Sequence, residues 1–338
     1  MSSSVTNHSR YLASHLDPAR PGHAYPVMKK RPLGETGIVV GEIGTGTAAL
    51  ARTQGTVVPD AEAVQILAYA LDMQASLVDV APTYGDGRAL GLLRQAMQGR
   101  RGQAQVSLKA GYFSDGHSDF SPAAVRASLE DSLRKLGTDY VDVLLLHNPA
   151  TSVLAATDPI WAELAKFKLE GKVRAIGASL TGADQMKAAL EKTPAQVLQF
   201  PFNVYAQEAA SVFDAAFKKR VGLIANRPLD SGFLTGRYRD LALFMDDRSR
   251  FSRADINRRS ELQAAYEPLA MRPDLTPTQA ALEFVLSFPQ LSCAIPGASD
   301  WHHVIGNVTA NQEPMPAETV AKLKALWESK VKASPLPL

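Results

Sequence analysis

The stretch SPAAVRASLEDSLRKLGTDYVDVLLLH, residues 121–147, contains one complete unit of the predicted fold. Ser121 and Pro122 are typical of a helix start, because a serine side chain caps the first turn and proline has no N–H to leave unbonded there. Apolar side chains then recur every three or four residues on one helical face: Val125, Leu129, Leu133 and Leu136. Gly137 is typical of a helix end. The nearly continuous apolar run Val141–Leu146 predicts a strand buried on both faces of a sheet.

The same alternation of short apolar runs and helical segments extends in both directions from this unit. The eight candidate strands are Ile43–Thr45, Leu77–Val80, Val106–Lys109, Val141–Leu146, Val173–Gly177, Val197–Phe200, Gly222–Ala225 and Ser292–Ile295. Eight alternating units predict a parallel sheet closed into an α/β fold, the (β/α)8 TIM barrel. We expect a single barrel domain over residues 29–338, with a short β-hairpin at Arg31–Val40 that closes its bottom, after a polar N-terminal tail over residues 1–28.

Composition and charge exclude several other classes of protein. Of 338 residues, 36 are Lys or Arg and 34 are Asp or Glu, and only residues 29–31 form a dense basic patch, so we expect no nucleic-acid or membrane partner. Cys293 is the single cysteine, which excludes an intrachain disulfide and a cysteine-based metal cluster, and we predict no metal site. Residues 1–28 lack the apolar segment of a secretion signal, and they favour a loose tail over an organellar transit peptide. The default compartment is the cytoplasm.

The segment Gly44–Ala49 fits the loose dinucleotide-binding pattern G-x-G-x-x-A. That pattern has meaning only where a helix follows at once and places its N-terminus under the pyrophosphate. Here helical periodicity does not begin until after Pro59. We therefore expect a barrel rather than a dinucleotide-binding fold, and we expect Gly46 to let the end of the first strand pass close to a ligand or a neighbouring strand.

Four polar side chains lie where the apolar strands end. Asp79 belongs to the second candidate strand, Lys109 ends the third, His147 follows the fourth, and Tyr84 lies in the loop after the second. The active site of an α/β barrel forms at the C-terminal ends of its strands, so we expect the four side chains on one rim. Each has an ordinary structural explanation on its own, such as packing, a structural hydrogen bond or a salt bridge. Their occurrence on adjacent strands favours a catalytic site.

These four residue types suit the reduction of a carbonyl group by hydride. Hydride transfer to carbon leaves negative charge on oxygen, and a proton must arrive there. Tyr84 would be the general acid in reduction and the base in oxidation, with Lys109 lowering the pKa of its phenol from about 10. Asp79 would keep Lys109 charged, and His147 would donate a hydrogen bond that positions the carbonyl oxygen.

From about Leu33 to Trp327 the chain resembles the aldo-keto reductases, whose catalytic tetrad of Asp, Tyr, Lys and His is matched in order and context by the four residues above. The resemblance implies an NAD(P)H-dependent reductase for aldehydes, ketones or sugars. The family's habit favours NADPH as the cofactor, with NADH as the alternative. A small carbonyl substrate is the expected partner, and the sequence carries no signal for an oligomeric state.

The resemblance also implies a set of cofactor contacts. Ser179 and Gln199 match the residues that hold the nicotinamide carboxamide, although a helix cap and a strand-end hydrogen bond would explain them equally. Residues 228–237 resemble the pyrophosphate loop, and residues 295–298 resemble the adenosine-binding stretch. The cofactor-binding residues implied are Gly46, Asp79, Ser179, Gln199, Pro228, Leu229, Ser231, Gly232, Leu234, Arg237, Ile295, Gly297, Ala298, Ser299, His303 and Asn307.

Some positions depart from the family's pattern. Leu180 replaces the second member of the carboxamide-binding pair, and Gly297 and His303 replace basic or Gln residues near the 2′-phosphate. Arg and Lys are the usual ligands of such a phosphate, and residues 295–307 contain neither. We therefore expect a modest preference for NADPH, about tenfold, which strengthens from about pH 8 to 6 as His303 becomes charged.

Two other functions fit the same scaffold. A cofactor-binding regulatory subunit would keep the tetrad but turn over slowly, although the chain shows no partner-binding extension beyond its polar tail. A Schiff-base lyase would use Lys109 as its nucleophile, but Asp79 beside it would keep the amine protonated.

Barrel loops set the choice of substrate, here residues 112–120, 150–159 and 240–257. Four aromatic residues in or near these loops would either line an aromatic pocket or pack against helices: Phe113, Trp161, Phe244 and Phe251.

Overall fold

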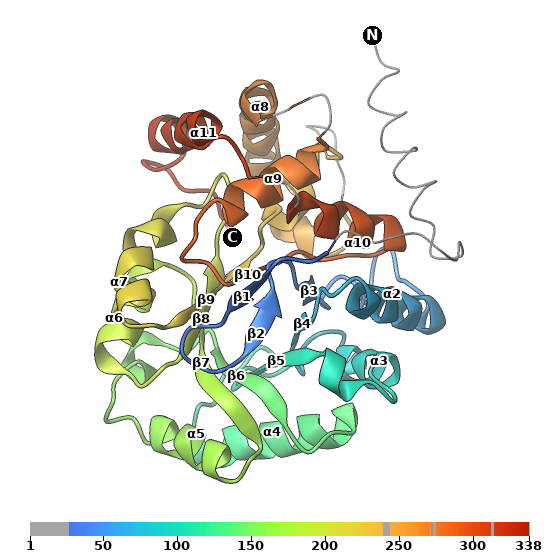
Figure 1. The fold of residues 1–338 in the computed structure, drawn as a ribbon, viewed down its shortest axis with the longest axis vertical. Helices are drawn as coiled ribbons and strands as arrows, with labels where there is room; N and C mark the ends of the chain where they lie inside the picture. The colour runs from blue at the N-terminus through green and yellow to red at the C-terminus, as the bar shows by residue number, and fades with distance from the viewer. Residues whose placement is uncertain (1–26, 239–243, 271, 273–274, 312–313, 338) are drawn as a thin grey trace.

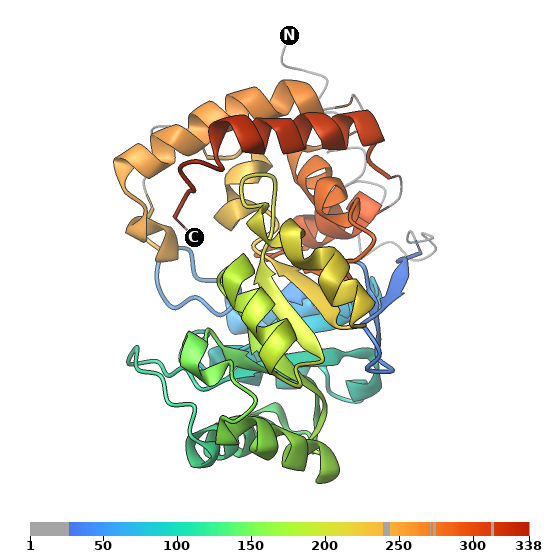
Figure 2. The same cartoon turned by 90° about the vertical axis from the view of Figure 1, so that its left-hand side faces the viewer.

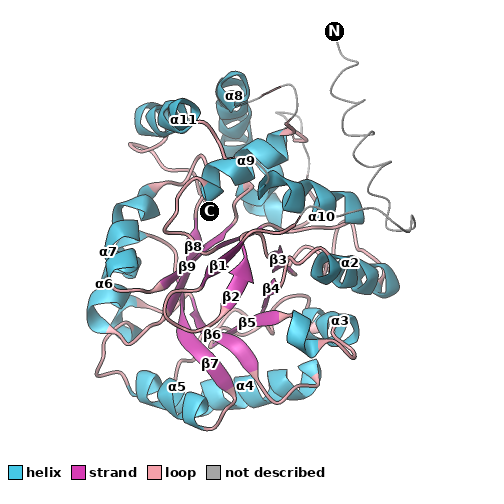
Figure 3. Ribbon diagram, viewed as in Figure 1, coloured by secondary structure: helices cyan, strands magenta, loops and turns pink. Residues whose placement is uncertain are grey.

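The centre of the molecule is a barrel of eight parallel strands (Figures 1 and 3). The computed structural model describes residues 27–238, 244–270, 272, 275–311 and 314–337. In chain order the barrel strands are β3 (Thr45–Gly46), β4 (Leu77–Val80), β5 (Gln105–Ala110), β6 (Val141–His147), β7 (Val173–Ser179), β8 (Val197–Pro201), β9 (Gly222–Asn226) and β10 (Cys293–Ile295). Each strand pairs with the next along the chain, and the Gly44 N–H donates to the carbonyl of Ala294 at 2.8 Å, which joins the two ends of the sheet. The predicted (β/α)8 barrel is confirmed.

Most strands differ from their predicted bounds by one or two residues at an end, and the first strand is displaced along the chain. We expected the first strand over Ile43–Thr45, whereas β3 covers Thr45–Gly46. Thr45 and Gly46 pair with Val78 and Asp79 on β4, while Ile43 pairs on the other side, with Ala294 of β10. The segment therefore passes from one neighbour to the other at the point where the barrel closes.

Helices surround the barrel (Figure 3). They are α2 (Asp60–Asp72), α3 (Arg88–Ala96), α4 (Pro122–Leu136), α5 (Pro159–Leu169), α6 (Ala183–Lys192), α7 (Phe213–Lys218), α8 (Arg253–Ala270), α9 (Pro277–Leu286), α10 (Trp301–Val308) and α11 (Ala317–Lys330). The expected end signals of α4 are present: Ser121 Oγ accepts from the Ala124 N–H at 3.3 Å, and Gly137 has a φ of 64°. Within the described residues, no helix combines the length and the apolar character needed to span a bilayer.

A two-stranded hairpin closes one end of the barrel. β1 (Lys30–Pro32) pairs antiparallel with β2 (Val39–Gly41), as the sequence predicted. Leu33, Ile38 and Val40 are buried in one cluster with side chains of the barrel interior, including those of β6 and β9. The hairpin thus shields the interior from water at the end opposite the C-terminal rim. Residues 1–26 of the predicted polar tail lie outside the described residues.

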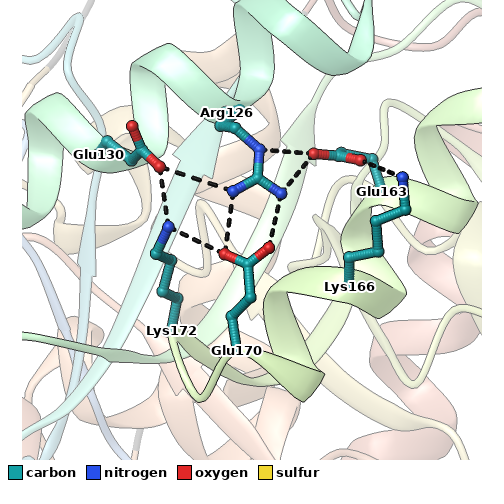
Figure 4. Close-up of polar contacts among 6 residues, drawn as sticks. All are labelled: Arg126, Glu130, Glu163, Lys166, Glu170 and Lys172. Carbon is teal, nitrogen blue, oxygen red and sulfur yellow. Dashed lines mark hydrogen bonds and ion pairs between the residues drawn. The ribbon is translucent and has the colours of Figure 1, made fainter.

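An ion-pair network joins α4 to α5 and to the start of β7 (Figure 4). Arg126 donates to Glu163 at 2.6 Å and to the two carboxylate oxygens of Glu170 at 2.7 and 2.9 Å. Lys172 bridges Glu170 and Glu130 at 2.9 and 2.8 Å. Hydrogen bonds from Arg126 and then Lys172 lower the pKa of the Glu170 carboxyl to about 2.

This network predicts an acid-sensitive contribution to stability. Glutamate in an unfolded chain has a pKa of about 4.3, above the folded value, so the contribution of Glu170 is fully present above about pH 4.5 and is lost as the pH falls toward 2. Glu170→Gln is expected to lower the Tm at pH 7 by about 1–2 °C, and the deficit should shrink between pH 5 and 3. Thermal unfolding followed by circular dichroism measures both. Glu191→Gln, at an exposed position on α6, is the control, and a deficit that stays constant with pH would contradict the prediction.

Candidate active site

Asp79, Lys109 and His147 lie side by side because their strands are consecutive in the barrel. Asp79 is on β4, Lys109 on β5, and His147 is the last residue of β6. The ammonium of Lys109 donates to the Asp79 carboxylate and also to Tyr84 Oη, the latter at 2.8 Å. The structure therefore brings the four predicted catalytic residues to one rim, with Lys109 between an aspartate and a phenol.

Asp79 is held by neighbours from the barrel interior. Asp79 is only 3% exposed, and its Oδ1 accepts from Gln199 Nε2 at 2.7 Å and from Ser107 Oγ at 3.3 Å. The amide oxygen of Gln199 in turn accepts from Ser179 Oγ at 3.0 Å and from Asn226 Nδ2 at 3.1 Å. The donors to its oxygen fix the orientation of the Gln199 amide, so that its NH2 group faces Asp79. The bonds from Gln199 and Ser107 in turn reduce the cost of burying the Asp79 carboxylate.

The charge of Lys109 depends on the balance between burial and its partners. Burial by itself lowers the pKa of the ammonium group, but the Asp79 carboxylate, followed by Tyr84, outweighs it and raises the pKa above its ordinary value. Lys109 is therefore protonated at neutral pH. A protonated amine is not a nucleophile, which argues against the Schiff-base lyase.

Tyr84 behaves differently from the expectation based on sequence. Desolvation raises the pKa of its phenol and Lys109 lowers it, and desolvation is the larger of the two, so the pKa lies above its ordinary value. The predicted lowering by Lys109 is present, but the burial that the sequence does not show outweighs it. Tyr84 is fully protonated at neutral pH, which is the form that a general acid needs.

His147 is neutral in this environment. Burial, and then the positive charge of Lys109, lower the pKa of its imidazole to about 3. Its ring makes edge contacts with Tyr84 and Tyr112, at centroid distances of 6.4 and 5.4 Å. A neutral imidazole keeps one N–H, so His147 can donate a hydrogen bond but has no spare proton to give at neutral pH.

A cavity of about 610 Å³ contains all four side chains and extends to the start of α10. Most of the residues predicted to bind cofactor also line it: Gly46, Ser179, Pro228, Leu229, Ser231, Gly232, Arg237, Ile295, Gly297, Ala298, Ser299, His303 and Asn307. Two do not. Gln199 lies behind Ser179 and Asp79, and Leu234 is buried in the hydrophobic core with its N–H bonded to the carbonyl of Leu229.

The loop after β9 has an unusual backbone. Asp230, Ser231 and Gly232 have φ values of 45°, 56° and 95°, three left-handed residues in succession. Such a conformation costs about 1–3 kcal/mol at each non-glycine residue. Other contacts must therefore hold this wall of the cavity in place.

Arginine residues from distant segments also line the cavity, and the sequence analysis assigned none of them. They are Arg52 after β3, Arg227 after β9, and Arg248 and Arg250 before α8. Arg52 and Arg248 both contact Asp246, at 3.5 and 2.6 Å, which links the loop after β3 to the segment before α8. No spacing along the chain signals this convergence, because the arginines come from the connection after β3 and from separated positions in the long connection between β9 and α8.

His303 lies at the adenosine end of the predicted site. Its Nδ1 is 3.2 Å from Ser299 Oγ and 3.2 Å from the Asp300 carboxylate. Burial lowers the pKa of His303, Asp300 raises it, and the nearby Arg237 lowers it further, so the net pKa lies below its ordinary value. Burial therefore opposes the expected charging of His303 as the pH falls from 8 to 6. Arg237 lines the same cavity close enough to His303 to lower its pKa, whereas residues 295–307 contain no Arg or Lys.

The four aromatic residues considered for substrate binding pack elsewhere. Trp161 is buried in the main core, Phe113 stacks on His117, and Phe244 and Phe251 surround Phe233. Within the described residues, the cavity lining includes none of the four.

Part of the predicted loop 240–257 is helical, since α8 begins at Arg253. Ser252 Oγ accepts from the Asp255 N–H at 3.1 Å, and the Asp255 carboxylate accepts from the Ser252 N–H at 3.0 Å. This reciprocal cap is a signal that the sequence analysis missed. Residues 239–243 lie outside the described residues.

Comparison with known proteins decides the family. The model of the aldo/keto reductase family matches residues 42–328. The chain belongs to the aldo-keto reductase family. It is therefore an NAD(P)H-dependent oxidoreductase.

Relatives of this reductase cover nearly its whole length. An uncharacterized oxidoreductase of Bacillus subtilis is 25% identical over 311 residues, which is 90% of this chain and 95% of the relative. A glycerol dehydrogenase from Gluconobacter oxydans has a TM-score of 0.76 at 24% identity and covers 91% of this chain and 97% of its own. An aldo-keto reductase from Bacillus halodurans has a TM-score of 0.75 at 23% identity, with 88% and 96% covered. These two structures share the fold of this aldo-keto reductase.

Proposed function

We propose that the protein reduces the carbonyl group of a small aldehyde, ketone or sugar, with Tyr84 as the general acid. The observation that carries the proposal is the placement of the Lys109 ammonium between the Asp79 carboxylate and Tyr84 Oη, at the wall of the cavity. This arrangement provides a protonated phenol and a fixed positive charge at one point. Both are needed where negative charge develops on a carbonyl oxygen.

The donors that line the cavity suit a nicotinamide dinucleotide. Arginine side chains, with the backbone of residues 229–232, would hold the phosphates, and Ser179 would meet the carboxamide. Ser299, His303 and Asn307 would contact the adenosine end. When bound, the cofactor supplies the hydride.

The side chains of the protein then supply the proton and the orientation. Tyr84 transfers its phenolic proton to the carbonyl oxygen, and Lys109 stabilises the phenolate that remains. Neutral His147 donates a hydrogen bond to the same oxygen and fixes its position. Asp79 keeps Lys109 charged and in place.

The proposal is tested by assaying the purified protein with NADPH and NADH against aldehydes, ketones, sugars and quinones. Turnover of at least one aldehyde, ketone or sugar is expected. Tight cofactor binding without turnover of any substrate would instead favour the regulatory subunit. Trapping of a substrate adduct on Lys109 by borohydride would favour the lyase.

For the choice of cofactor we propose a preference for NADPH that depends on Arg237. A guanidinium carries its positive charge independently of pH in proteins, whereas burial lowers the pKa of His303 below its ordinary value. Arg237→Ala is expected to weaken NADPH binding about tenfold and to leave NADH binding unchanged, with little dependence on pH between 6 and 8. Dissociation constants for both cofactors across that range provide the measurement, with His303→Ala as the control. Equal losses for both cofactors would show that Arg237 does not select for the 2′-phosphate.

A further inference from the structure

The loop Asp230–Gly232 forms a wall between two cavities. Ser231 and Gly232 line the cavity that contains the tetrad, whereas Asp230 lines a second cavity, of about 870 Å³, beside α11. All three residues have positive φ values. Adjacent residues of one loop therefore face different cavities. A contact that fixes Asp230 in the second cavity also restrains Ser231 and Gly232 in the first.

Arg259 on α8 is the partner of Asp230. Its Nε donates to Asp230 Oδ2 at 2.8 Å, and its Nη2 lies 3.4 Å from Oδ1. The side chain of Arg259 is 0% exposed, and its guanidinium lies over the rings of Phe233 and Phe251, at 5.0 and 4.2 Å from their centroids. The pair is thus an enclosed salt bridge between the loop and a helix.

The same guanidinium also binds the C-terminal segment. Arg259 Nη2 donates to the carbonyl of Pro337 at 2.6 Å, while the neighbouring Arg258 donates to Ser334 Oγ at 3.2 Å and to the Lys330 carbonyl at 3.1 Å. Figure 2 shows α8 and α11 lying side by side, with the C-terminus below them. Arg259 therefore connects the loop, α8 and the end of the chain.

An enclosed salt bridge resists rearrangement more than an exposed one does. If the loop relaxed to an unstrained backbone, Asp230 would move away and leave the charge of Arg259 buried without this carboxylate. The cost of that unpaired charge opposes the backbone strain at Asp230 and Ser231. The salt bridge therefore supplies the external support that the left-handed loop requires.

We propose that Arg259 is a positioning residue that acts through Asp230, from outside the cofactor cavity, to hold Ser231 and Gly232 in the conformation that receives the cofactor's pyrophosphate. The inference rests on the proposed role of this loop in cofactor binding. It predicts that the salt bridge contributes to cofactor affinity by preorganising the loop, although neither of its residues belongs to the tetrad.

The test uses Asp230→Asn and Arg259→Gln in the full-length protein, with two measurements. Hydrogen exchange of the cofactor-free protein should show faster exchange at the Gly232 and Leu234 amides, which both bond to the carbonyl of Leu229. Titration with NADPH and NADH should show dissociation constants raised about tenfold, with kcat at saturating cofactor within about twofold of the wild type. The double variant should bind no more weakly than the worse single variant, because both substitutions remove one interaction.

Arg258→Gln is the matched control, since it alters the adjacent arginine and its contacts with the C-terminal segment but not Asp230. It should leave both measurements unchanged, and Arg259→Lys, which keeps the charge, should restore most of the affinity. Unchanged dissociation constants in folded variants, or losses that multiply in the double variant, would overturn the inference. If the wild type binds neither cofactor, the proposed function fails, and normal exchange at the loop amides would then refute the positioning role separately.

Discussion

Tyr84→Phe is expected to lower the rate of carbonyl reduction by about 10²-fold or more, with the cofactor dissociation constant nearly unchanged. The substitution removes one oxygen, which is bonded to Lys109 Nζ at 2.8 Å, and keeps the ring that contacts His147. Because the phenol is protonated at neutral pH, the loss should appear in kcat rather than in binding. Single-turnover rates, together with a cofactor titration, make the measurement.

A neighbouring tyrosine provides the control for this experiment. Tyr112 contacts the His147 ring from its own loop and is 37% exposed, and its hydroxyl has no place in the proposed proton transfer. Tyr112→Phe should keep kcat within about threefold of the wild type. Retention of most of the activity by Tyr84→Phe would refute the assignment of Tyr84 as the general acid.

Lys109→Met is expected to lower kcat by about 10³-fold and to shift the alkaline limb of the pH–rate profile. In the wild type, Lys109 lowers the pKa of Tyr84 against the opposing effect of burial. Without the ammonium of Lys109, the effect of burial on Tyr84 is larger and the pKa of its phenol rises further. The phenolate needed for alcohol oxidation then appears only at higher pH. Oxidation rates measured across the alkaline range test this direction.

The same variant leaves the buried Asp79 carboxylate without its cation, which we expect to cost about 3–5 kcal/mol of stability. The double variant Asp79→Asn/Lys109→Met removes both charges and should recover much of this stability while remaining inactive. A double variant that is stable and active, or an alkaline limb that does not move in Lys109→Met, would contradict the role given to Lys109.

Local patterns were sufficient to predict the architecture. The caps at Ser121 and Gly137 and the apolar run at Val141–Leu146 each depend on a few neighbouring residues, and the structure has all three as expected. The tetrad could be located for the same reason, since each member lies in or just after a recognisable strand. Once the strands are parallel and consecutive, their C-terminal ends must meet at one rim.

The net pKa shifts of Tyr84 and His303 could not be predicted in this way. The sequence shows that Lys109 and Tyr84 come close, but the direction of the Tyr84 pKa depends on how much water the fold excludes around the phenol. His303 is a similar case, because burial and Arg237 lower its pKa and Asp300 raises it. The net pKa of a group is the sum of such opposing effects, and it can be worked out only when the positions of all the neighbouring groups are known.

The sequence by itself determined the order of strands and helices, the hairpin that closes the barrel, and the four residues at its rim, because hydrophobic periodicity and end signals act over a few residues. Only the tertiary structure decided that burial outweighs Lys109 in setting the pKa of Tyr84, that Arg52, Arg227, Arg248 and Arg250 line one cavity with the tetrad, and that Arg259 pairs with Asp230. These features depend on Coulomb forces and desolvation between groups up to about 200 residues apart in the chain, which fall off with distance in space and not with separation in sequence.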